Sequence, residues 1–376
     1  HPVAHSFPTR RSSDLAHRKI AQAIMSCRTQ KQGGRLYTCD ECDKTFTLYH
    51  SCRNRHCPKC QATARSAWVS GRRDELLNVN YHHIVFTVPQ QLKTFARAHK
   101  ETFYSLMFKA VSETLLTLGA DRKHLGGTIG IIAILHTWTQ TLAFHPHIHC
   151  IVPSGALAPD GVEWIGAKSG CMFPINVVKQ LYRGKFMALF RQALKAKQIM
   201  PTATRNRPAI KDTINMLYQT DWVVYMEESY NDPDQVIKYL AGYTNRIAIS
   251  DRRIKRVDGQ TVTFSYRDRR DNNREKEMVL PIVAFIGRFL EHAVPSGFVR
   301  IRYYGLFANR DRAEKIALCR MAIDGVEYVY VGDEQESVPP AILSPLAVCC
   351  PHCRCKRIKR VEEIPKDVAA FYRKSA

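Results

Sequence analysis

The cysteines constrain this chain more than any other feature of its sequence. Ten of the 13 gather in two stretches, one holding Cys27, Cys39, Cys42, Cys52, Cys57 and Cys60 and the other Cys349, Cys350, Cys353 and Cys355. The pairs Cys39/Cys42 and Cys57/Cys60 both have the spacing C-x2-C and lie close together in sequence. Four thiolates in two such pairs are the ligands of a tetrahedral structural Zn²⁺ site. We therefore predict a compact zinc ribbon held by Cys39, Cys42, Cys57 and Cys60.

Other side chains near the four predicted zinc ligands could take the place of one of them. Cys27, His50, Cys52 and His56 are close enough in sequence to replace one of the four cysteines. The C-x2-C spacing of Cys350 and Cys353 makes this pair a candidate for a second zinc knuckle. No matching C-x2-C pair lies near it in sequence, so it could also be half of a knuckle. A segment as small as residues 27–61 has little core of its own and needs the metal to fold.

The charge of the chain indicates a polyanionic partner. Its 376 residues carry 56 Lys and Arg against 34 Asp and Glu, a net charge of +22 with a pI near 9.6. Such an excess is typical of nucleic-acid binding. Candidate phosphate contacts are Arg53, Arg55 and Lys59 in the Cys-rich stretch, the basic-aromatic strip with Arg300 and Arg302, and the tail 354–360.

Apolar content and motifs exclude several other classes. Hydrophobic residues make up 45% of the chain, which suits a packed core and excludes a wholly disordered chain. The longest apolar run, residues 129–135, is far shorter than the roughly 20 residues of a membrane span, so we expect no membrane partner. The sequence contains no GxxxxGK[ST] motif, and we expect no nucleotide cofactor.

Periodicity predicts a mixed α+β chain. Strands are expected at 81–88, 128–136, 147–153 and 222–225, and the second and third can pair as an antiparallel hairpin. Helices are expected at 16–25, 62–77, 92–118, 177–195, 233–243 and 281–291, with Gly119 as a C-cap and residues 200–214 as a linker. Beyond residue 250 the chain reads as β-like segments and a basic tail.

Histidines on the predicted hairpin form a candidate metal site. His147 and His149 flank Ile148, so strand alternation directs both imidazoles to one face of the sheet. A hairpin centred near residue 142 brings His136 opposite them. Three histidines with open coordination positions are typical of a catalytic ion, and neutral imidazole prefers transition metals such as Mn²⁺ to Mg²⁺. Histidines that simply pack beside a core strand are the alternative.

Two tyrosines complete the chemically informative residues. Tyr239 and Tyr243 are spaced i, i+4 on a predicted helix, which places both hydroxyls on one helix face. Taken alone, such a pair is most often part of a core or an interface.

These stretches together resemble a known family. SCRNRHCPKCQ (51–61), HHIVFTVP (82–89), LHTWTQTLAFHPHIHCIVPSGAL (135–157), KYLAGYTNRIAIS (238–250) and FVRIRYYGLFAN (298–309) occur in the order seen in IS91-family transposases. That family comprises two-tyrosine HUH endonucleases of rolling-circle transposition with an N-terminal zinc-binding domain. The resemblance covers the chain from about residue 27 to about residue 310.

The resemblance implies roles for these residues. It implies an α+β fold in which a zinc ribbon precedes a HUH domain with a central antiparallel sheet, followed by a basic C-terminal region. His136, His147 and His149 would hold Mg²⁺ or Mn²⁺, and Tyr239 or Tyr243 would attack single-stranded DNA at transposon ends and target to form a 5′-phosphotyrosine. Arg246, which follows the tyrosines, joins the DNA-binding set. Other HUH enzymes take the third metal ligand from the tyrosine helix.

The sequence departs from the family pattern at two positions. Relatives commonly carry Arg where Gly242 stands and His where Asn245 stands. A relaxase or replication initiator with the same chemistry, a zinc-ribbon DNA-binding protein with a decayed nuclease, and a metal hydrolase without a tyrosine nucleophile remain alternatives. The expected location is the cytoplasm of a bacterium, with the nucleoid. The oligomeric state stays open.

The chain divides by these features into four expected parts. Residues 5–15 read HSFPTRRSSDL, the conceptual translation of a common sequencing adapter, so we expect 1–15 to be an artefact and the natural N-terminus to be missing. Residues 16–78 form the expected zinc-binding and DNA-binding domain, 79–250 the two-tyrosine nuclease domain, and 251–376 a basic DNA-binding region.

Overall fold

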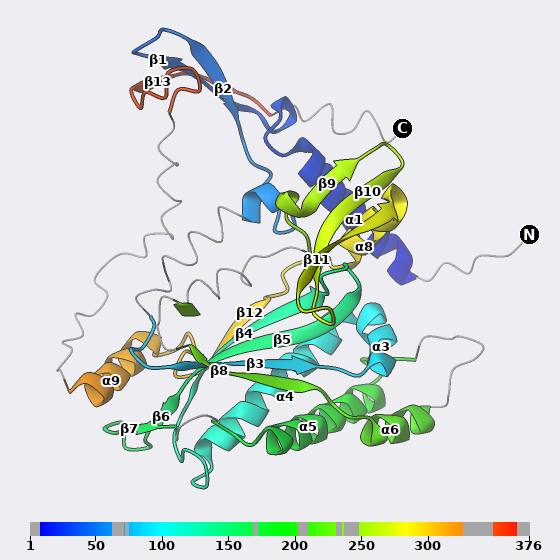
Figure 1. Ribbon diagram of the computed structural model, residues 1–376, viewed down its shortest axis with the longest axis vertical. Coiled ribbons are helices and arrows are strands. Elements are labelled where there is room, and N and C mark those ends of the chain that lie inside the picture. Colours follow the sequence, from blue (N-terminus) through cyan, green and yellow to red (C-terminus); the bar gives the residue numbers. More distant parts are fainter. Residues whose placement is uncertain are drawn as a thin grey trace, which may run out of the picture. The chain divides into compact units, whose positions relative to one another are not determined.

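The computed structural model describes residues 8–61, 71, 75–167, 172–201, 210–230, 235–236, 248–325 and 349–366, with 8–14 and 227–230 described by their backbone alone. The chain forms two compact units (Figure 1). The first comprises His1–Gly71, Asn245–Ile254 and Glu334–Ala376, and the second Arg72–Thr244 and Lys255–Asp333. Residues of the expected C-terminal region therefore belong to both units.

A five-stranded antiparallel sheet is the centre of the second unit (Figure 1). Its strands, in spatial order, are β12 (Ile301–Gly305), β4 (Gly130–Trp138), β5 (Phe144–Pro153), β3 (Tyr81–Thr87) and β8 (Val224–Tyr230). Every neighbouring pair is antiparallel. The predicted central antiparallel sheet and the predicted hairpin of β4 and β5 are thus confirmed.

Helices cover one face of this sheet (Figure 1). Apolar residues alternate along the strands, and those of β4 and β5 pack with α4 (Lys100–Ala120) and α5 (Ile175–Lys195) in one continuous core. The core is rich in aromatic side chains that are almost fully inaccessible to solvent: Phe86, Phe95, Phe103, Phe108, Tyr182, Phe186, Phe190 and Trp222. Because this face is filled, any polar site on the sheet must lie on the opposite face.

Two local predictions need correction. The helix expected at 92–118 is divided into η2 (Gln90–Leu92), α3 (Lys93–Ala98) and α4, because His99 has the non-helical angles φ −130° and ψ 51°. Gly119 lies inside α4 and is not its C-cap; a Cβ there would meet the Ile129 side chain at 2.8 Å, so close packing explains this glycine.

The remaining elements of the second unit surround the sheet. They are β6 (Gly155–Leu157), β7 (Trp164–Gly166), α6 (Ile210–Gln219), β9 (Ile254–Val257), β10 (Thr261–Asp268), β11 (Arg274–Pro281), α8 (Ile282–Glu291) and α9 (Arg312–Asp324). Helix α6 begins within the expected linker, so the prediction of a linker through residue 214 was wrong there. The reason is that Leu217 is buried and its carbonyl accepts a hydrogen bond from Trp222 Nε1 at 2.9 Å.

The first unit joins the N-terminal and C-terminal parts of the chain. Helix α1 (Pro8–Ser26) contains the helix expected at 16–25 and is followed by η1 (Gln30–Gln32). A small sheet has the order β13 (Ile358–Ile364), β1 (Gly34–Cys39), β2 (Thr45–Tyr49). In the described parts of both units, no helix is long and apolar enough to cross a membrane.

Candidate functional site

Three histidines meet on the face of the sheet that the helices leave open. Register pairs His136 of β4 with His147 of β5, and Ile134 with His149. Their ligand nitrogens lie within 4.8 Å of one another. The ring centroids of His136 and His149 are 4.6 Å apart, and those of His147 and His149 are 4.8 Å apart. The structure therefore brings together the three residues that the hairpin predicted.

Hydrogen bonds define which nitrogens face a prospective ion. Nδ1 of His147 lies 2.7 Å from the His145 carbonyl, which can only accept, so Nδ1 carries the proton. The Nε2 lone pair of His147 is then the ligand atom. Nδ1 of His149 lies 2.9 Å from Nε2 of His83, and the two rings stack with centroids 5.1 Å apart. This contact directs Nε2 of His149 to the ligand role, as in metal sites where a second residue fixes the tautomer.

His83 is a residue that the sequence reasoning missed. It lies on β3 and is buried, and β3 pairs with β5 so that Val85 stands opposite His149. The available signal was the alternation of side chains along β3. Residues 83 and 85 point to the same face of the sheet, and His149, opposite Val85, points to that face as well. That signal becomes useful only once the pairing of β3 with β5 is known.

Burial and nearby charges favour the neutral form of His147 and His149. Burial lowers the pKa of His147 to about 3 and holds the pKa of His149 well below its ordinary value; neighbouring histidines and Arg269 act in the same direction. Neutral imidazole is the form that binds metals. Three imidazole donors at this spacing fit one divalent ion with open positions for a substrate oxygen.

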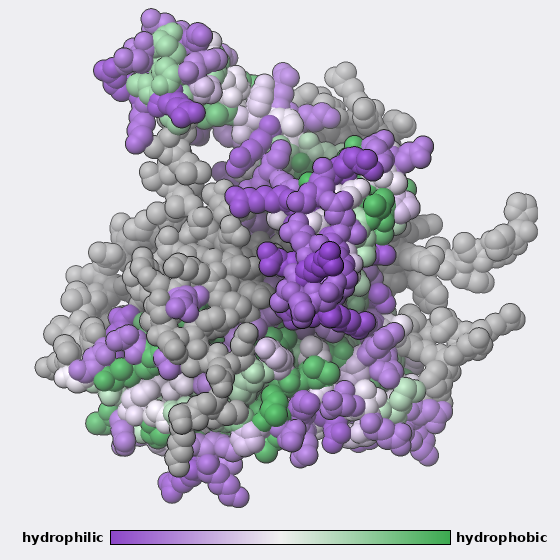
Figure 2. Space-filling model, viewed as in Figure 1, coloured by the Kyte–Doolittle hydropathy of each residue, from purple (hydrophilic) through white to green (hydrophobic). Residues whose placement is uncertain are grey.

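A basic hairpin accompanies the cluster. Arg269, in the turn between β10 and β11, is exposed, and its charge acts on both His147 and His149. Hydrophilic side chains gather over this small β9–β11 sheet (Figure 2). Arg269 thus contributes positive charge at the histidine cluster. The sequence reasoning did not single it out because the hairpin that carries it lies far from the histidines in the chain.

The predicted tyrosines lie outside the described residues. Tyr239, Tyr243 and Arg246 all belong to the segment 237–247. The structure therefore adds nothing on their placement.

The predicted zinc ligands separate into two clusters. Cys57 and Cys60 join Cys27 and Cys52, whereas Cys39 and Cys42 join Cys350 and Cys353; within each cluster all sulfur atoms lie within 4.8 Å. A single site made of Cys39, Cys42, Cys57 and Cys60 is not what the structure shows. The physical reason is that strand β13 places the distant C-terminal pair beside Cys39, with Ile358 opposite Cys39 in register.

Basic residues predicted to contact DNA fall into different environments. Arg53, on a loop, and Lys59, in the helical turn that follows it, are exposed near the first cysteine cluster, while partial burial lowers the pKa of Arg55. Arg300 precedes β12, and its carbonyl accepts a hydrogen bond from Leu135. Arg302 stacks over the Phe108 ring at 4.3 Å on the helix-covered face, so its guanidinium serves packing there.

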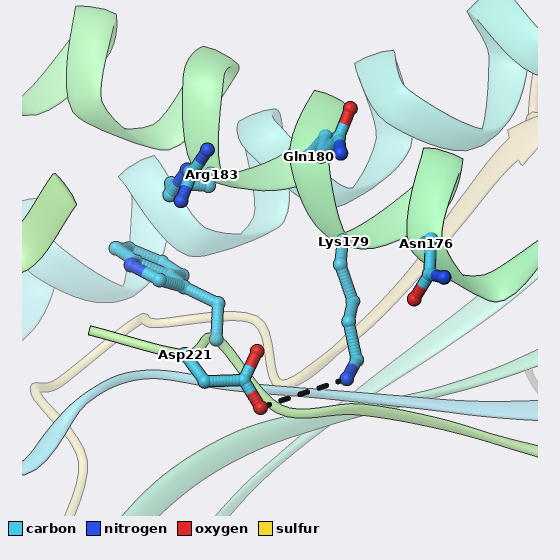
Figure 3. A pocket seen from close by; sticks show the side chains of 6 residues that line it. Asn176, Lys179, Gln180, Arg183 and Asp221 are labelled. Atoms are coloured by element: carbon cyan, nitrogen blue, oxygen red, sulfur yellow. Dashed lines mark ion pairs between the residues drawn. The ribbon is translucent and has the colours of Figure 1, made fainter. Parts of the chain in front are cut away.

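A polar hollow of about 220 Å³ lies elsewhere on the second unit (Figure 3). Asn176, Lys179, Gln180 and Arg183 of α5 line it together with Asp221 and Trp222. Figure 3 shows Lys179 directed toward Asp221, and the two form an ion pair of 3.7 Å. None of the clustered histidines or cysteines contributes to its lining, so it is separate from both kinds of metal site.

Comparison with known proteins places these features in one class. Strands β4 and β5, which carry the three clustered histidines, lie in a segment, residues 130–315, that matches the model of a family described as putative transposase. Residues 3–88, with the first cysteine cluster, match the model described as transposase zinc-binding domain. The chain is thus a transposase with a zinc-binding domain.

Two relatives identify the family. A Sinorhizobium fredii protein named putative transposase y4qJ is 41% identical over 82% of this chain and 79% of its own length. The transposase for insertion sequence element IS801 of Pseudomonas savastanoi pv. phaseolicola is 26% identical over 76% of this chain and 69% of its own length. The chain belongs to the IS91 family of transposases.

Proposed function

We propose that this transposase nicks and rejoins single-stranded DNA at the ends of its element through a 5′-phosphotyrosine intermediate, by HUH chemistry. The observation that carries the proposal is the cluster of His136, His147 and His149, whose ligand nitrogens lie within 4.8 Å of one another on the open face of the sheet. The matched transposase segment contains all three histidines.

The histidines supply the first part of the chemistry. His147 and His149 offer Nε2; the His145 carbonyl sets the tautomer of His147, and His83 holds Nδ1 of His149. A divalent ion, when bound, neutralises charge on the scissile phosphate. Arg269 adds a fixed positive charge near that position and favours the binding of a phosphate between the hairpin and the cluster.

A tyrosine supplies the second part. The hydroxyl oxygen of Tyr239 or Tyr243 attacks the phosphorus, the bond from phosphorus to the 3′ oxygen breaks, and a phosphotyrosine forms on the 5′ end. The phenol loses its proton, and the departing 3′ oxygen gains one. Since the free phenol has a pKa of about 10, its ionisation needs nearby positive charge. Attack by a 3′-hydroxyl reverses the step, so rejoining consumes no ATP.

The test is a denaturing-gel assay with end-labelled single strands that tile the ends of the element, in Mn²⁺ or Mg²⁺. The wild type is compared with Tyr239→Phe, Tyr243→Phe, the double variant and His149→Ala. Tyr218→Phe is the matched control, because Tyr218 lies on α6 and its ring, stacked with Arg191, is retained. We expect a protein-linked 5′ fragment that persists in the control, disappears in the double variant and falls at least about a hundred-fold in His149→Ala.

Other outcomes would separate the alternatives. Metal-dependent cleavage without a covalent adduct, unaffected by the double tyrosine change, would favour a hydrolase. DNA binding with no cleavage in either metal would favour a decayed nuclease. Equal cleavage of unrelated plasmid origins would favour a relaxase or a replication initiator.

A further inference from the structure

The second cysteine cluster combines residues from opposite ends of the chain. Cys39 ends strand β1 and Cys42 follows it, and Cys350 and Cys353 precede strand β13. We propose that these four residues form a second structural zinc site, distinct from the one at Cys27, Cys52, Cys57 and Cys60, and that the C-terminal segment 349–366 closes it.

The two halves of the proposed site have the same local conformation. In the first, the Asp43 amide donates to the Cys39 carbonyl at 3.0 Å, and the Glu41 amide donates to the Cys39 sulfur at 3.4 Å. Asp43, which follows the second cysteine, has a positive φ of 52°. This turn exposes both sulfurs to one side and supplies an amide donor to the first of them, which stabilises a thiolate.

The C-terminal half repeats this turn at equivalent positions. The Arg354 amide donates to the Cys350 carbonyl at 2.9 Å, and the His352 amide donates to the Cys350 sulfur at 3.4 Å. Arg354, directly after Cys353, has a φ of 62°. Two copies of one knuckle that face each other supply the four ligands of a zinc ribbon.

The sulfur positions fit a tetrahedral ion. Cys39 and Cys353 have their sulfurs 3.5 Å apart, and Cys42 and Cys350 have theirs 3.6 Å apart. Zinc–sulfur bonds of about 2.3 Å in a tetrahedron place the sulfurs roughly 3.8 Å apart. Disulfide sulfurs lie at about 2.05 Å, so these thiols are not oxidised pairs.

Strand pairing and ion pairs align the two halves independently of any ion. Strand β13 pairs with β1 along its length, from Gly34 opposite Ile364 to Cys39 opposite Ile358. Arg357 pairs with Glu41, and Lys359 with Asp40 at 3.3 Å, both beside the cysteines. The C-terminal knuckle is therefore positioned by specific contacts and not by the thiols alone.

This small sheet lacks the core that would hold it without metal. In β1 only Gly34 and Cys39 are buried, and no residue of β2 or β13 is buried. Exposed ion pairs contribute little to stability. A coordinated ion is the remaining source of stabilisation, as in other small metal-bound ribbons. Residues 349–366 lie outside both segments that match family models, so this assignment extends the zinc module beyond residues 3–88.

The test measures metal in the full-length chain. Zinc is quantified by plasma mass spectrometry in the wild type, Cys350→Ser and Cys353→Ser. Cys349→Ser and Cys355→Ser are matched controls in the same knuckle but outside the cluster. We expect each cluster variant to hold one zinc ion fewer than the wild type and each control to hold the wild-type amount. A cluster variant that keeps all its zinc, or a control that loses as much, would overturn the proposal.

A second measurement distinguishes loss of the proposed site from misfolding and from zinc bound at the histidines. In the cobalt-substituted protein only thiolate sites give sulfur-to-cobalt charge-transfer absorption. We expect Cys353→Ser to lose about half of this absorption, since one of two four-thiolate sites is lost. Cys350→His, which supplies another zinc ligand, should restore the second ion. Full absorption in Cys353→Ser, or a wild type with only one thiolate-bound cobalt, would contradict the assignment.

Discussion

His83 shows how a residue outside the ligand set can control the site. Its Nε2 contacts Nδ1 of His149, and both rings are buried. We expect His83→Ala to weaken Mn²⁺ binding by about 10- to 100-fold, because the His149 ring loses the hydrogen-bond partner that orients it. Titration calorimetry with Mn²⁺ measures this change.

The neighbouring histidine provides the control for that prediction. His82 is equally buried on the same strand, but it contacts Ser154 Oγ at 2.9 Å and not the cluster. His82→Ala should leave the Mn²⁺ affinity unchanged. Equal weakening in the two variants would mean that His83 acts only through the stability of the strand.

The buried His292 should make the free energy of unfolding depend on pH. Its Nε2 lies 3.1 Å from the Leu142 carbonyl, and burial lowers its pKa to about 4, against the opposing charge effect of Glu291. The unfolded chain, with a histidine pKa near 6.5, therefore binds the proton more readily. The stabilisation is present above pH 6.5 and is lost as the pH falls toward 4.

The magnitude follows from the two pKa values. Between pH 7 and pH 5, His292 should lower the free energy of unfolding by about 2 kcal/mol. Urea unfolding at both pH values, compared with His292→Gln, isolates this contribution from those of the other histidines. If the variant shows the same pH-dependent loss as the wild type, His292 is not the titrating group.

Among the elements, two glycines lead to opposite expectations. Gly184 lies within α5, and a Cβ there would have no neighbour within 4 Å. Gly184→Ala should raise the free energy of unfolding by about 1 kcal/mol, because alanine has the higher helix propensity. Thermal unfolding of the full chain measures the change, and a destabilised variant would show that α5 needs flexibility at this position.

Gly305, at the end of β12, is a glycine that should not tolerate a side chain, unlike Gly184. It has a φ of 61°, and a Cβ would lie 1.9 Å from the Ile129 carbonyl oxygen. Gly305→Ala should lower the free energy of unfolding by about 2 kcal/mol or more, because both the backbone angle and the close approach oppose a side chain. A Tm equal to that of the wild type would show that the β12 end can rearrange freely.

The basic run at residues 354–360 shows that a count of positive charges does not tell which of them are free to bind DNA. The run 354–360 reads as a phosphate-binding tail, yet Arg357, Lys359 and Arg360 form ion pairs with Glu41, Asp40 and Glu363. The first two pairs join the β13 segment to residues that follow β1, whereas Arg360 and Glu363 both lie on β13. Much of the positive charge in this element is therefore used within the first unit.

For the whole molecule, the net charge of +22 predicts strongly salt-dependent binding to DNA. If the protein neutralises about four phosphates of a single strand, raising the salt concentration from about 50 to about 200 mM should lower the affinity for DNA roughly 50-fold. Fluorescence anisotropy with a labelled oligonucleotide across this range measures the slope. A flat salt dependence would mean that the basic surface makes no phosphate contacts.

The sequence itself determined the local parts of the site. Strand alternation and a short hairpin fixed His136, His147 and His149 on one face, since both depend only on residues near one another in the chain. It also indicated metal-binding cysteines and a central antiparallel sheet. The tyrosine pair Tyr239 and Tyr243 stays a prediction from the resemblance.

Only the tertiary structure decided which distant groups share a site. The sequence offered Cys57 and Cys60 as the nearest partners of Cys39 and Cys42, but the pairing of β1 with β13 places Cys350 and Cys353 there instead. His83 joined His149 for the same reason, through the pairing of β3 with β5. Thiolates and imidazoles combine according to distance in space, and strand pairing between remote segments sets that distance.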